Sequence, residues 1–424
     1  MKKKIVSVIA FLSIIFVLTA FLGRFFADKT SWYNKSEFFN AKTGFDALFF
    51  GSSRMHEAAD PIYLWENYGI ASYNLSSSGE SIQMTYYVLS EALENCHPKM
   101  VFVDASKISE ETGSINSKYG FVHESIDALP LNKNKLEAID YARNFFEGGR
   151  LAFISMLYAY HDRYDDLKER DFTNTVNYDK GAYIMTSVMK RTMPDTFTDK
   201  VSPLKDGDGV RYYKRILDLC RNQDVICVLT DIPVNKAVYD EERQMKLNAL
   251  KALTEEKGGK TILFNNILDE IDMDYDHDFG DASHLNFMGA KKVCDYLAGY
   301  MKENGVKDHR DDPDYSVPWT EDIEKYKLQR IKMLDSKEEA VAYLFGAMGG
   351  DNEISLYIRN RDDLLNQYGM DICLEMVKPE IRDAGDEELG GFDMKIEVRS
   401  GKDGSLLAGK SFEYNIYSGM FLAG

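Results

Sequence analysis

Phe45-Asp46-Ala47-Leu48-Phe49-Phe50-Gly51-Ser52-Ser53-Arg54 joins a short apolar run to a glycine and a pair of serines. A short, almost uniformly apolar run is typical of a strand that is buried on both faces of a parallel sheet. Glycine and serine are typical of the point where such a strand gives way to a turn. We therefore expect a buried strand that ends at Phe50 and a helix that starts after the two serines.

Further apolar runs repeat this pattern along the chain, separated by stretches with helical spacing or many charges. The expected strands are 73–75, 100–104, 225–230 and 261–264, and the expected helices are 81–93, 212–221, 241–256 and 287–301. Strands that alternate with helices indicate a parallel sheet with helices on both faces. The predicted fold class is therefore α/β, with a three-layer, flavodoxin-like parallel sheet.

The alternation breaks between residues 107 and 210, where polar and aromatic helical segments such as 135–146 and 151–167 follow one another. We interpret this stretch as a helical insertion after the third strand. Ligands of doubly wound sheets bind at the carboxyl ends of the strands, so an insertion here could roof the ligand crevice. A packing subdomain without contact to the ligand is an equally good interpretation.

A polar stretch with two prolines, residues 307–319, follows the last expected helix of the sheet. Such a stretch is typical of a break between folded units. It predicts a linker over 307–319 between a large α/β domain, residues 28–306, and a smaller domain, residues 320–424.

Within the smaller domain, 353–358 and 394–398 alternate like half-exposed strands. Lys402-Asp403-Gly404-Ser405 has the chemistry of a hairpin turn. We expect a small accessory α+β domain in which the scattered carboxylates are solvated rather than part of a site. Its strand-like pattern runs on through 415–424, which leaves open whether the domain is complete.

The chain opens with Met1-Lys2-Lys3-Lys4 and then has no charge from Ile5 to Gly23, a run of 19 residues. A helix needs about 20 apolar residues to cross a bilayer, so residues 1–27 are predicted to be a membrane anchor. Three lysines before the run and one arginine after it favour a single-pass plasma-membrane protein with a cytoplasmic N-terminus and an extracytoplasmic bulk. A cleaved signal peptide is the alternative, but the bulky residues 21–26 lack a small-residue cleavage pattern.

Composition excludes several classes of partner and cofactor. The formal net charge is −18, whereas a protein that binds a nucleic-acid backbone needs a basic surface, so no nucleic-acid partner is expected. The five cysteines are few and odd in number, which argues against a disulfide framework. Cys220 and Cys227 lack the second pair that a zinc site would need, so no metal and no cofactor are expected.

Two segments carry candidate chemistry. Ser53 follows the first strand, and Asp281-Ala282-Ser283-His284 precedes the helix expected from 287, with Asn286 as its N-cap. A serine hydroxyl becomes a nucleophile when a base takes its proton, and histidine has a suitable pKa at neutral pH. Asp281, three residues before His284, can accept a hydrogen bond from the imidazole and fix its tautomer. We therefore predict a catalytic Ser53, Asp281 and His284.

Developing negative charge at such a site needs hydrogen-bond donors, which form an oxyanion hole. The backbone N–H of Ser53 lies at an expected helix N-terminus, where amides are unpaired. Gly79, at the end of the next expected strand, lets a second backbone N–H approach closely. Each feature alone is a common turn or loop, but their joint order at the ends of parallel strands favours a site.

These residues resemble the SGNH/GDSL hydrolase superfamily over roughly residues 45–302. Gly51-Ser52-Ser53-Arg54 matches its first block with Ser53 as the nucleophile, Gly79 matches the second-block glycine, and Asp281-Ala282-Ser283-His284 matches the last block. The N-terminal anchor makes the chain similar to cell-envelope members of that superfamily, including the D-alanylation protein of teichoic acid synthesis and the partner proteins of membrane-bound O-acyltransferases.

The match departs from the family pattern in two places. Ser52 stands where the first block has aspartate, and Val103-Asp104-Ala105-Ser106-Lys107 replaces a third block that supplies an asparagine as an oxyanion donor. Loss of one such donor costs about 10²- to 10³-fold in rate. Either Asn74, Ser106 or another group substitutes for it, or hydrolysis is weak.

The resemblance implies a serine esterase or O-acyltransferase that handles acyl groups, in particular acetyl, on a cell-wall or exopolysaccharide polymer. A multi-span membrane O-acyltransferase is then an expected partner. The first alternative is a catalytically inactive assembly factor that binds an acyltransferase or the polymer, and a second is a lipase-like enzyme at the membrane surface. His56 could line the pocket, but a position on the surface or behind the residues that touch the substrate is an equally good interpretation. His277 could bind a metal, but a solvated acidic loop is the better interpretation.

Overall fold

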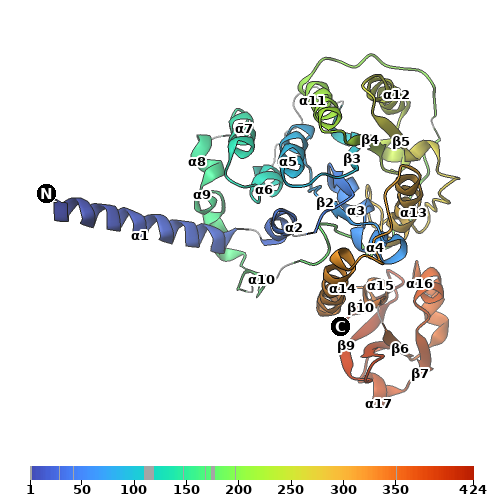
Figure 1. Ribbon diagram of the computed structural model, residues 1–424. Helices are drawn as coiled ribbons and strands as arrows, with labels where there is room; N and C mark the ends of the chain where they lie inside the picture. Colours follow the sequence, from blue (N-terminus) through green and yellow to red (C-terminus); the bar gives the residue numbers. More distant parts are fainter. Residues whose placement is uncertain are drawn as a thin grey trace.

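The computed structural model describes residues 2–27, 29–41, 43–108, 119–146, 148–167, 169–172, 177–195, 197–349 and 351–424. Several residues of the predicted insertion, among them 109–118 and 173–176, therefore lie outside the described parts. Figure 1 shows an α/β body from which one long N-terminal helix projects, with a second sheet at the C-terminal end of the chain.

The body is built on a parallel sheet of five strands in the order β2-β1-β3-β4-β5. All five strands that the apolar runs predict are present. They are β1 (Ala47–Phe50), β2 (Ser72–Asn74), β3 (Met100–Asp104), β4 (Ile226–Asp231) and β5 (Lys260–Leu263). Because parallel neighbours end at the same edge, the residues that follow β1, β2 and β3 are brought together.

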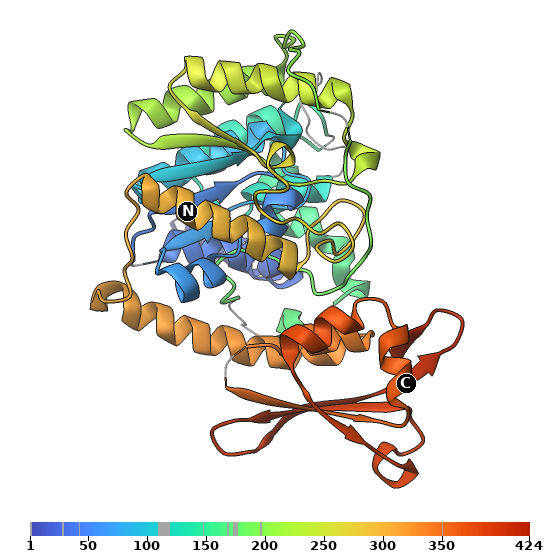
Figure 2. The ribbon, with the colours of Figure 1, turned by 90° about the vertical axis from the view of Figure 1, so that its right-hand side faces the viewer.

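Helices cover both faces of this sheet, as Figure 2 shows. On one face lie α5 (Ile82–Asn95), α11 (Asp208–Asn222) and α12 (Glu241–Glu256), and on the other α3 (Ser53–Ala58), α4 (Pro61–Tyr68) and α13 (Phe287–Glu303). Successive strand residues point to opposite faces of the sheet. Phe50 and Val103 pack in the core under α5, α11 and α12, and Phe49 and Phe102 pack in the core under α3 and α13. Burial of both faces explains why the strands read as continuous apolar runs.

The insertion consists of short helices, of which the first two pack against α5. They are α6 (Tyr119–Ile126), α7 (Lys133–Ala142), α8 (Gly149–Ile154), α9 (Met156–Tyr160) and α10 (Glu169–Phe172). The single helix predicted over 151–167 is wrong, because Ser155 ends α8 and its hydroxyl accepts the Tyr158 N–H to cap α9. From residue 177 to residue 195 the chain has left these helices and forms a turn at 179–181 followed by irregular structure.

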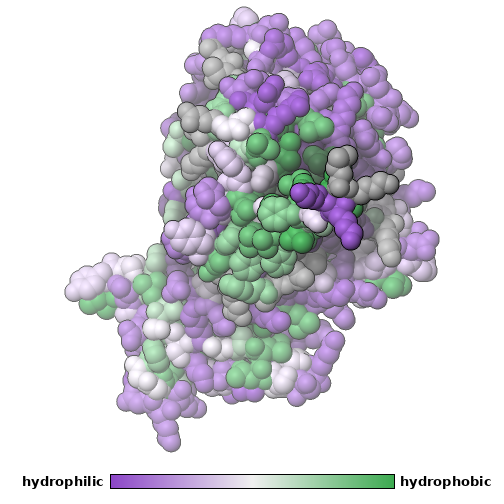
Figure 3. Space-filling view, turned by 90° about the vertical axis from the view of Figure 1, so that its left-hand side faces the viewer, coloured by the Kyte–Doolittle hydropathy of each residue, from purple (hydrophilic) through white to green (hydrophobic). Residues whose placement is uncertain are grey.

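Helix α1 (Lys2–Phe26) is the one helix in the described parts that is long and apolar enough to span a membrane. A shorter helix, α2 (Lys29–Asn40), connects it to the body. Only the end of α1 touches the rest of the protein: a Cβ added at Gly23 would lie 2.7 Å from the Leu157 backbone nitrogen, and Arg163 donates to the Phe26 carbonyl. Figure 3 looks at the face from which α1 projects, where apolar side chains gather.

The prediction of a linker over 307–319 is wrong from residue 313 onward, because α14 (Pro313–Met333) begins there. Asp312 caps this helix by accepting the Asp314 N–H, and Pro313 occupies its first position, where a missing N–H costs nothing. Trp319 is buried and stacks on Trp65 of α4 with 4.6 Å between ring centroids. The polar stretch therefore starts a helix that packs on the body.

A second five-stranded sheet follows, in the order β10-β9-β8-β6-β7, in which only β6 and β7 are parallel. Its strands are β6 (Asn352–Ile358), β7 (Glu380–Asp383), β8 (Met394–Ser400), β9 (Leu406–Asn415) and β10 (Met420–Ala423). The helices α15 (Ala340–Ala347), α16 (Met370–Val377) and α17 (Asp386–Leu389) accompany it, and the first two share its apolar core. The predicted hairpin turn joins β8 to β9, with Gly404 at φ +69.

Candidate active site

Ser53 lies at the first position of α3, directly beyond the carboxyl end of β1. The turn needs glycine at position 51, which has φ +142, and where a Cβ would lie only 2.4 Å from the Cβ of Asp104 on β3. This close approach lets Asp104 accept hydrogen bonds from the Ser52 hydroxyl at 2.6 Å and the Ser106 hydroxyl at 2.5 Å. The loops that end β1 and β3 are thus fixed to each other.

The structure brings Ser53 and His284 together across 231 residues of sequence. Ser53 Oγ lies 2.8 Å from Nε2 of His284, a hydrogen-bond distance. Both side chains are partly exposed, so a ligand can reach them. The spatial convergence expected from the two motifs is present.

Asp281 completes the arrangement on the other side of the ring. Its two oxygens lie 2.9 and 2.8 Å from Nδ1 of His284, and Oδ1 also accepts the backbone N–H groups of Ser283 and His284. Partial burial opposes ionisation, but these hydrogen bonds outweigh it and lower the pKa of Asp281. An ionised Asp281 keeps the proton on Nδ1, so Nε2 is free to accept the proton of Ser53.

A second carboxyl group stands beside His284 that the sequence did not single out. Glu57, on α3 one turn after Ser53, has Oε2 3.7 Å from Nδ1 of His284 and is only 8% exposed. Burial, with a smaller contribution from the charge of Asp281, raises the pKa of Glu57 to about 8. Glu57 is therefore mainly neutral at pH 7, and Asp281 is the charged partner of the histidine.

Two other histidines were weighed as functional. Burial, and then the charge of Lys35, lower the pKa of His56 to about 4, so its ring is neutral near Ser53. His277 is bound through Nδ1 to Asp274 at 2.7 Å and stacks on Tyr368. Among the residues that the structure describes, no group of three or more His, Cys, Asp or Glu side chains could hold a metal ion.

The predicted oxyanion donors have different surroundings. Gly79 lies in the turn after β2 with φ +59, and the neighbouring Ser77 N–H donates to the Gly51 carbonyl at 3.1 Å, which ties this turn to the loop before Ser53. The predicted role of Asn74 is not compatible with its position. Its buried amide donates to the carbonyls of Met55 at 3.0 Å and Ala59 at 2.9 Å, so its N–H groups hold the end of α3 instead.

The end of the insertion holds the Asp281–His284 loop in place. The extended segment 183–192 runs along the loop: Met189 N–H donates to the Phe279 carbonyl at 2.8 Å, and Phe287 N–H donates to the Met185 carbonyl at 2.9 Å. Arg191 Nε donates to the Asp281 carbonyl at 2.7 Å. The part of the insertion next to the site is therefore a strap that positions the loop.

Asn235, which follows β4, also donates to the carbonyl of Ala282 within the loop. Asn286 caps α13 as predicted, by accepting the Met288 and Gly289 N–H groups, and its amide also donates to the His277 carbonyl at 2.6 Å. Sequence patterns could identify the cap, but nothing in the sequence marked Arg191 or Asn235. Comparisons with protein-family models and with curated proteins found no match to this chain.

Proposed function

We propose that this chain is a membrane-anchored, extracytoplasmic serine esterase or O-acyltransferase of the SGNH type. Its substrates would be acyl groups, in particular acetyl, on a cell-wall or exopolysaccharide polymer. The observation that carries the proposal is the continuous hydrogen-bonded series from Ser53 Oγ through His284 to Asp281, with 2.8 Å between Oγ and Nε2. This order of nucleophile, base and orienting acid is recognised by geometry rather than by position in the sequence.

The proposed reaction has two steps. Ser53 Oγ attacks the ester carbonyl while its proton moves to Nε2 of His284, and the imidazolium then returns the proton to the leaving alcohol, which leaves an acyl group on Ser53. In the second step His284 takes a proton from water or from a polymer hydroxyl, whose oxygen attacks the acyl carbonyl. The bond from the acyl carbon to Ser53 Oγ then breaks, and the imidazolium returns the proton to Oγ. Water gives hydrolysis, and a hydroxyl gives transfer.

Negative charge on the carbonyl oxygen would be met by the backbone N–H groups of Ser53 and Gly79. The Ser106 hydroxyl lies within reach of Asp104 and Ser52 and is used there. With Asn74 also engaged, no side-chain amide among those predicted supplies a third donor. This favours a modest rate on simple esters, and it is the observation that keeps an inactive, polymer- or acyltransferase-binding assembly factor as the second candidate.

The anchor part of the proposal is supported by the packing of α1. Gly23 and Ala27 are buried against the body, and the guanidinium of Arg163 holds the Phe26 carbonyl at 2.6 Å. A segment removed after secretion would leave these contacts unmade. The three lysines at the start favour a cytoplasmic N-terminus, and a multi-span O-acyltransferase is proposed as a partner in the membrane.

A fluorophosphonate probe tests the central claim, because it forms a stable bond only with an activated serine. Full-length protein in detergent should be labelled at Ser53, as identified by mass spectrometry. Labelling should vanish in Ser53→Ala and fall strongly in His284→Ala, while Ser36→Ala on α2 should be labelled like the parent. Absence of labelling in the folded parent protein would favour the assembly factor.

A further inference from the structure

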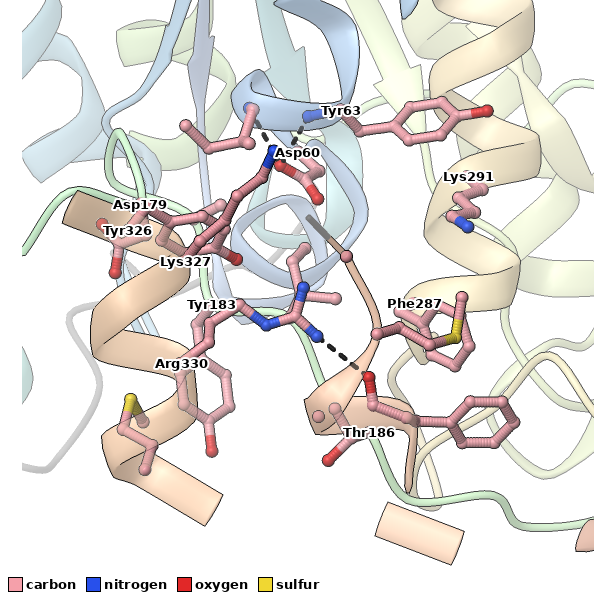
Figure 4. A pocket seen from close by; sticks show the side chains of 18 of the residues that line it. Asp60, Tyr63, Asp179, Tyr183, Thr186, Phe287, Lys291, Tyr326, Lys327 and Arg330 are labelled. Atoms are coloured by element: carbon pink, nitrogen blue, oxygen red, sulfur yellow. Dashed lines mark hydrogen bonds between the residues drawn. The ribbon is translucent and has the colours of Figure 1, made fainter. Parts of the chain in front are cut away.

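A cavity of about 330 Å³ lies where the α/β body meets the helices that precede the second sheet. Figure 4 shows its walls, which come from the start of α4, the segment 179–186, the first turns of α13, and α14 with the end of α15. None of the proposed catalytic side chains lines it. The cavity is therefore separate from the proposed catalytic residues, and the proposed reaction does not explain why it is present.

Three cations in these walls have no carboxylate partner among the described residues. Lys291 points its ammonium group toward the rings of Tyr63 and Phe287, at 5.6 and 5.3 Å from the ring centroids. Arg330 donates to the Phe345 carbonyl at 3.0 Å, as the dashed line in Figure 4 marks. Lys337 is the third, at the end of the wall that α14 forms.

The cavity also contains acidic side chains, but each of them already has a hydrogen-bond or ion-pair partner. Glu66 is paired with a fourth cation, Lys327, at 2.8 Å. Asp60 accepts the N–H groups of Ile62 and Tyr63 as the cap of α4, and Asp179 accepts the Gly181 N–H. The carboxylates thus satisfy backbone amides or Lys327. Among the described residues none of them forms an ion pair with the three other cations, although the charge of Asp60 acts on Lys291 and Arg330.

Burial disfavours the charged forms of both the aspartates and the lysines of this cavity. Burial raises the pKa of Asp60, and it raises that of Asp179 to about 7, so both are ionised less readily. Burial and then the nearby Arg330 lower the pKa of Lys337, and burial also lowers that of Lys291. A bound anion would stabilise the charged forms of these lysines, because an opposite charge nearby favours the protonated ammonium group.

Much of the remaining wall is aromatic. Tyr63, Tyr183, Tyr326, Phe287 and Phe345 line the cavity and give it flat apolar faces with hydroxyl groups at the edges. Pockets with apolar walls and a few convergent polar groups are typical of small-molecule sites. A volume near 330 Å³ suits one sugar-sized unit rather than a long chain.

The cavity is connected to the proposed active site through two backbone segments. Tyr183, at its edge, donates its N–H to the carbonyl of His56, one turn after Ser53. Phe287 and Lys291 follow His284 at the start of α13. A polymer unit held in the cavity would therefore lie beside the elements that carry the serine and the histidine.

We infer that this cavity is a binding subsite for one anionic sugar unit, whose phosphate or carboxylate group is held by Lys291, Arg330 and Lys337. The inference rests on the proposed function only in that the unit would belong to the polymer substrate; the binding itself stands without catalysis. It narrows the polymer to one that carries negative charge.

Isothermal titration calorimetry on the full-length protein in detergent tests the subsite, with glucose 6-phosphate, glucuronate and glucose as probes. At least one anionic probe should bind and glucose should bind at least tenfold more weakly; which of the two binds tighter identifies the anionic group. Lys291→Gln and Lys337→Gln should each weaken the binding of that probe by about tenfold, as expected for loss of a charged hydrogen-bond donor.

The double variant Lys327→Gln/Glu66→Gln is the matched control, because it removes a cation of the same cavity together with the carboxylate that neutralises it, so the net charge is unchanged and the affinity should change less than threefold. Equal weakening by all three variants, or equal binding of glucose and the anions, would overturn the inference. Ser53→Ala should bind the probe like the parent. Retained ester turnover in Ser53→Ala would end the proposed function and leave the subsite standing.

Discussion

Oε2 of Glu57 lies 3.7 Å from Nδ1 of His284, the same ring nitrogen that Asp281 approaches to 2.8 Å. Two carboxyl groups that share one imidazole nitrogen do not ionise equally easily. Hydrogen bonds favour the charged form of Asp281, whereas burial and that charge raise the pKa of Glu57 to about 8. The pair thus has one charged and one neutral member at pH 7.

This difference predicts a distinct pH dependence for Glu57→Gln. Above about pH 8 the parent protein gains a second negative charge beside His284, which stabilises the imidazolium formed during catalysis. We expect kcat/KM of the parent on p-nitrophenyl acetate to increase as the pH passes through about 8, and we expect this increase to be missing in Glu57→Gln. Identical profiles would show that Glu57 does not act on the histidine.

Stability should respond in the opposite sense. The pKa of Glu57 is about 8 in the folded protein against an ordinary value of 4.5, so the folded form holds an extra proton between these pH values. The free energy of unfolding then falls as pH rises through this window, by at most about 1.4 kcal/mol per pH unit, and levels off above pH 8. The melting temperature of the parent should therefore fall more from pH 5 to 8 than that of Glu57→Gln.

The three proposed catalytic residues should differ in their effect on turnover. Ser53→Ala and His284→Ala remove the nucleophile and the base, and each should reduce kcat to the background rate. Asp281→Asn leaves the base but favours the wrong tautomer, so a loss of about 10⁴-fold is expected. Unchanged melting temperatures of the serine and histidine variants would show that the losses are chemical; near-parent kcat in either would exclude the mechanism.

Asn74 offers a test that separates a structural role from an oxyanion role. Its amide donates to the Met55 and Ala59 carbonyls, so Asn74→Ala should remove these buried hydrogen bonds and lower the free energy of unfolding by about 1–3 kcal/mol. An oxyanion donor would instead reduce kcat by about 10²- to 10³-fold without a loss of stability. Chemical unfolding measured beside steady-state kinetics distinguishes the two results.

A buried ion pair behind the Gly79 turn should matter for folding. Lys35 is 2% exposed, and its ammonium group lies 2.8 Å from Glu80 and 3.2 Å from the Ser77 hydroxyl. Lys35→Met removes one partner and leaves a buried carboxylate, which costs about 3–5 kcal/mol, whereas the double variant Lys35→Met/Glu80→Gln should recover part of that loss. Additive losses in unfolding experiments would contradict a coupled pair.

Apolar runs and turn residues were sufficient to predict the sheet and the approach of Ser53 to His284. Parallel strands end at one edge, Ser53 directly follows β1, and the Asp281–His284 loop lies between β5 and α13. The features that the sequence did not reveal depend on tertiary burial. Glu57 looks like an ordinary helix-surface residue until α3 packs beside the Asp281 loop, and Arg191 acts through a backbone carbonyl. At Pro313, a residue typical of a break begins α14, since Asp312 caps it.

The contact between α1 and the insertion yields the final prediction. A side chain at Gly23 would meet the Leu157 backbone at 2.7 Å and the Met156 Cβ at 3.1 Å, and the bond from Arg163 to the Phe26 carbonyl prevents α1 from moving away freely. Gly23→Leu should therefore displace α9, with a cost of about 1–3 kcal/mol typical of overpacking. Local opening would become roughly tenfold more frequent, and limited proteolysis of the detergent-solubilised protein should cut between α8 and α10 correspondingly faster.

Gly299→Leu on α13, where no atom lies within 4 Å of an added Cβ, is the control and should be cut like the parent. Equal cleavage rates in Gly23→Leu and the parent would mean that α1 does not pack on the insertion, and the argument for a retained anchor would lose its support.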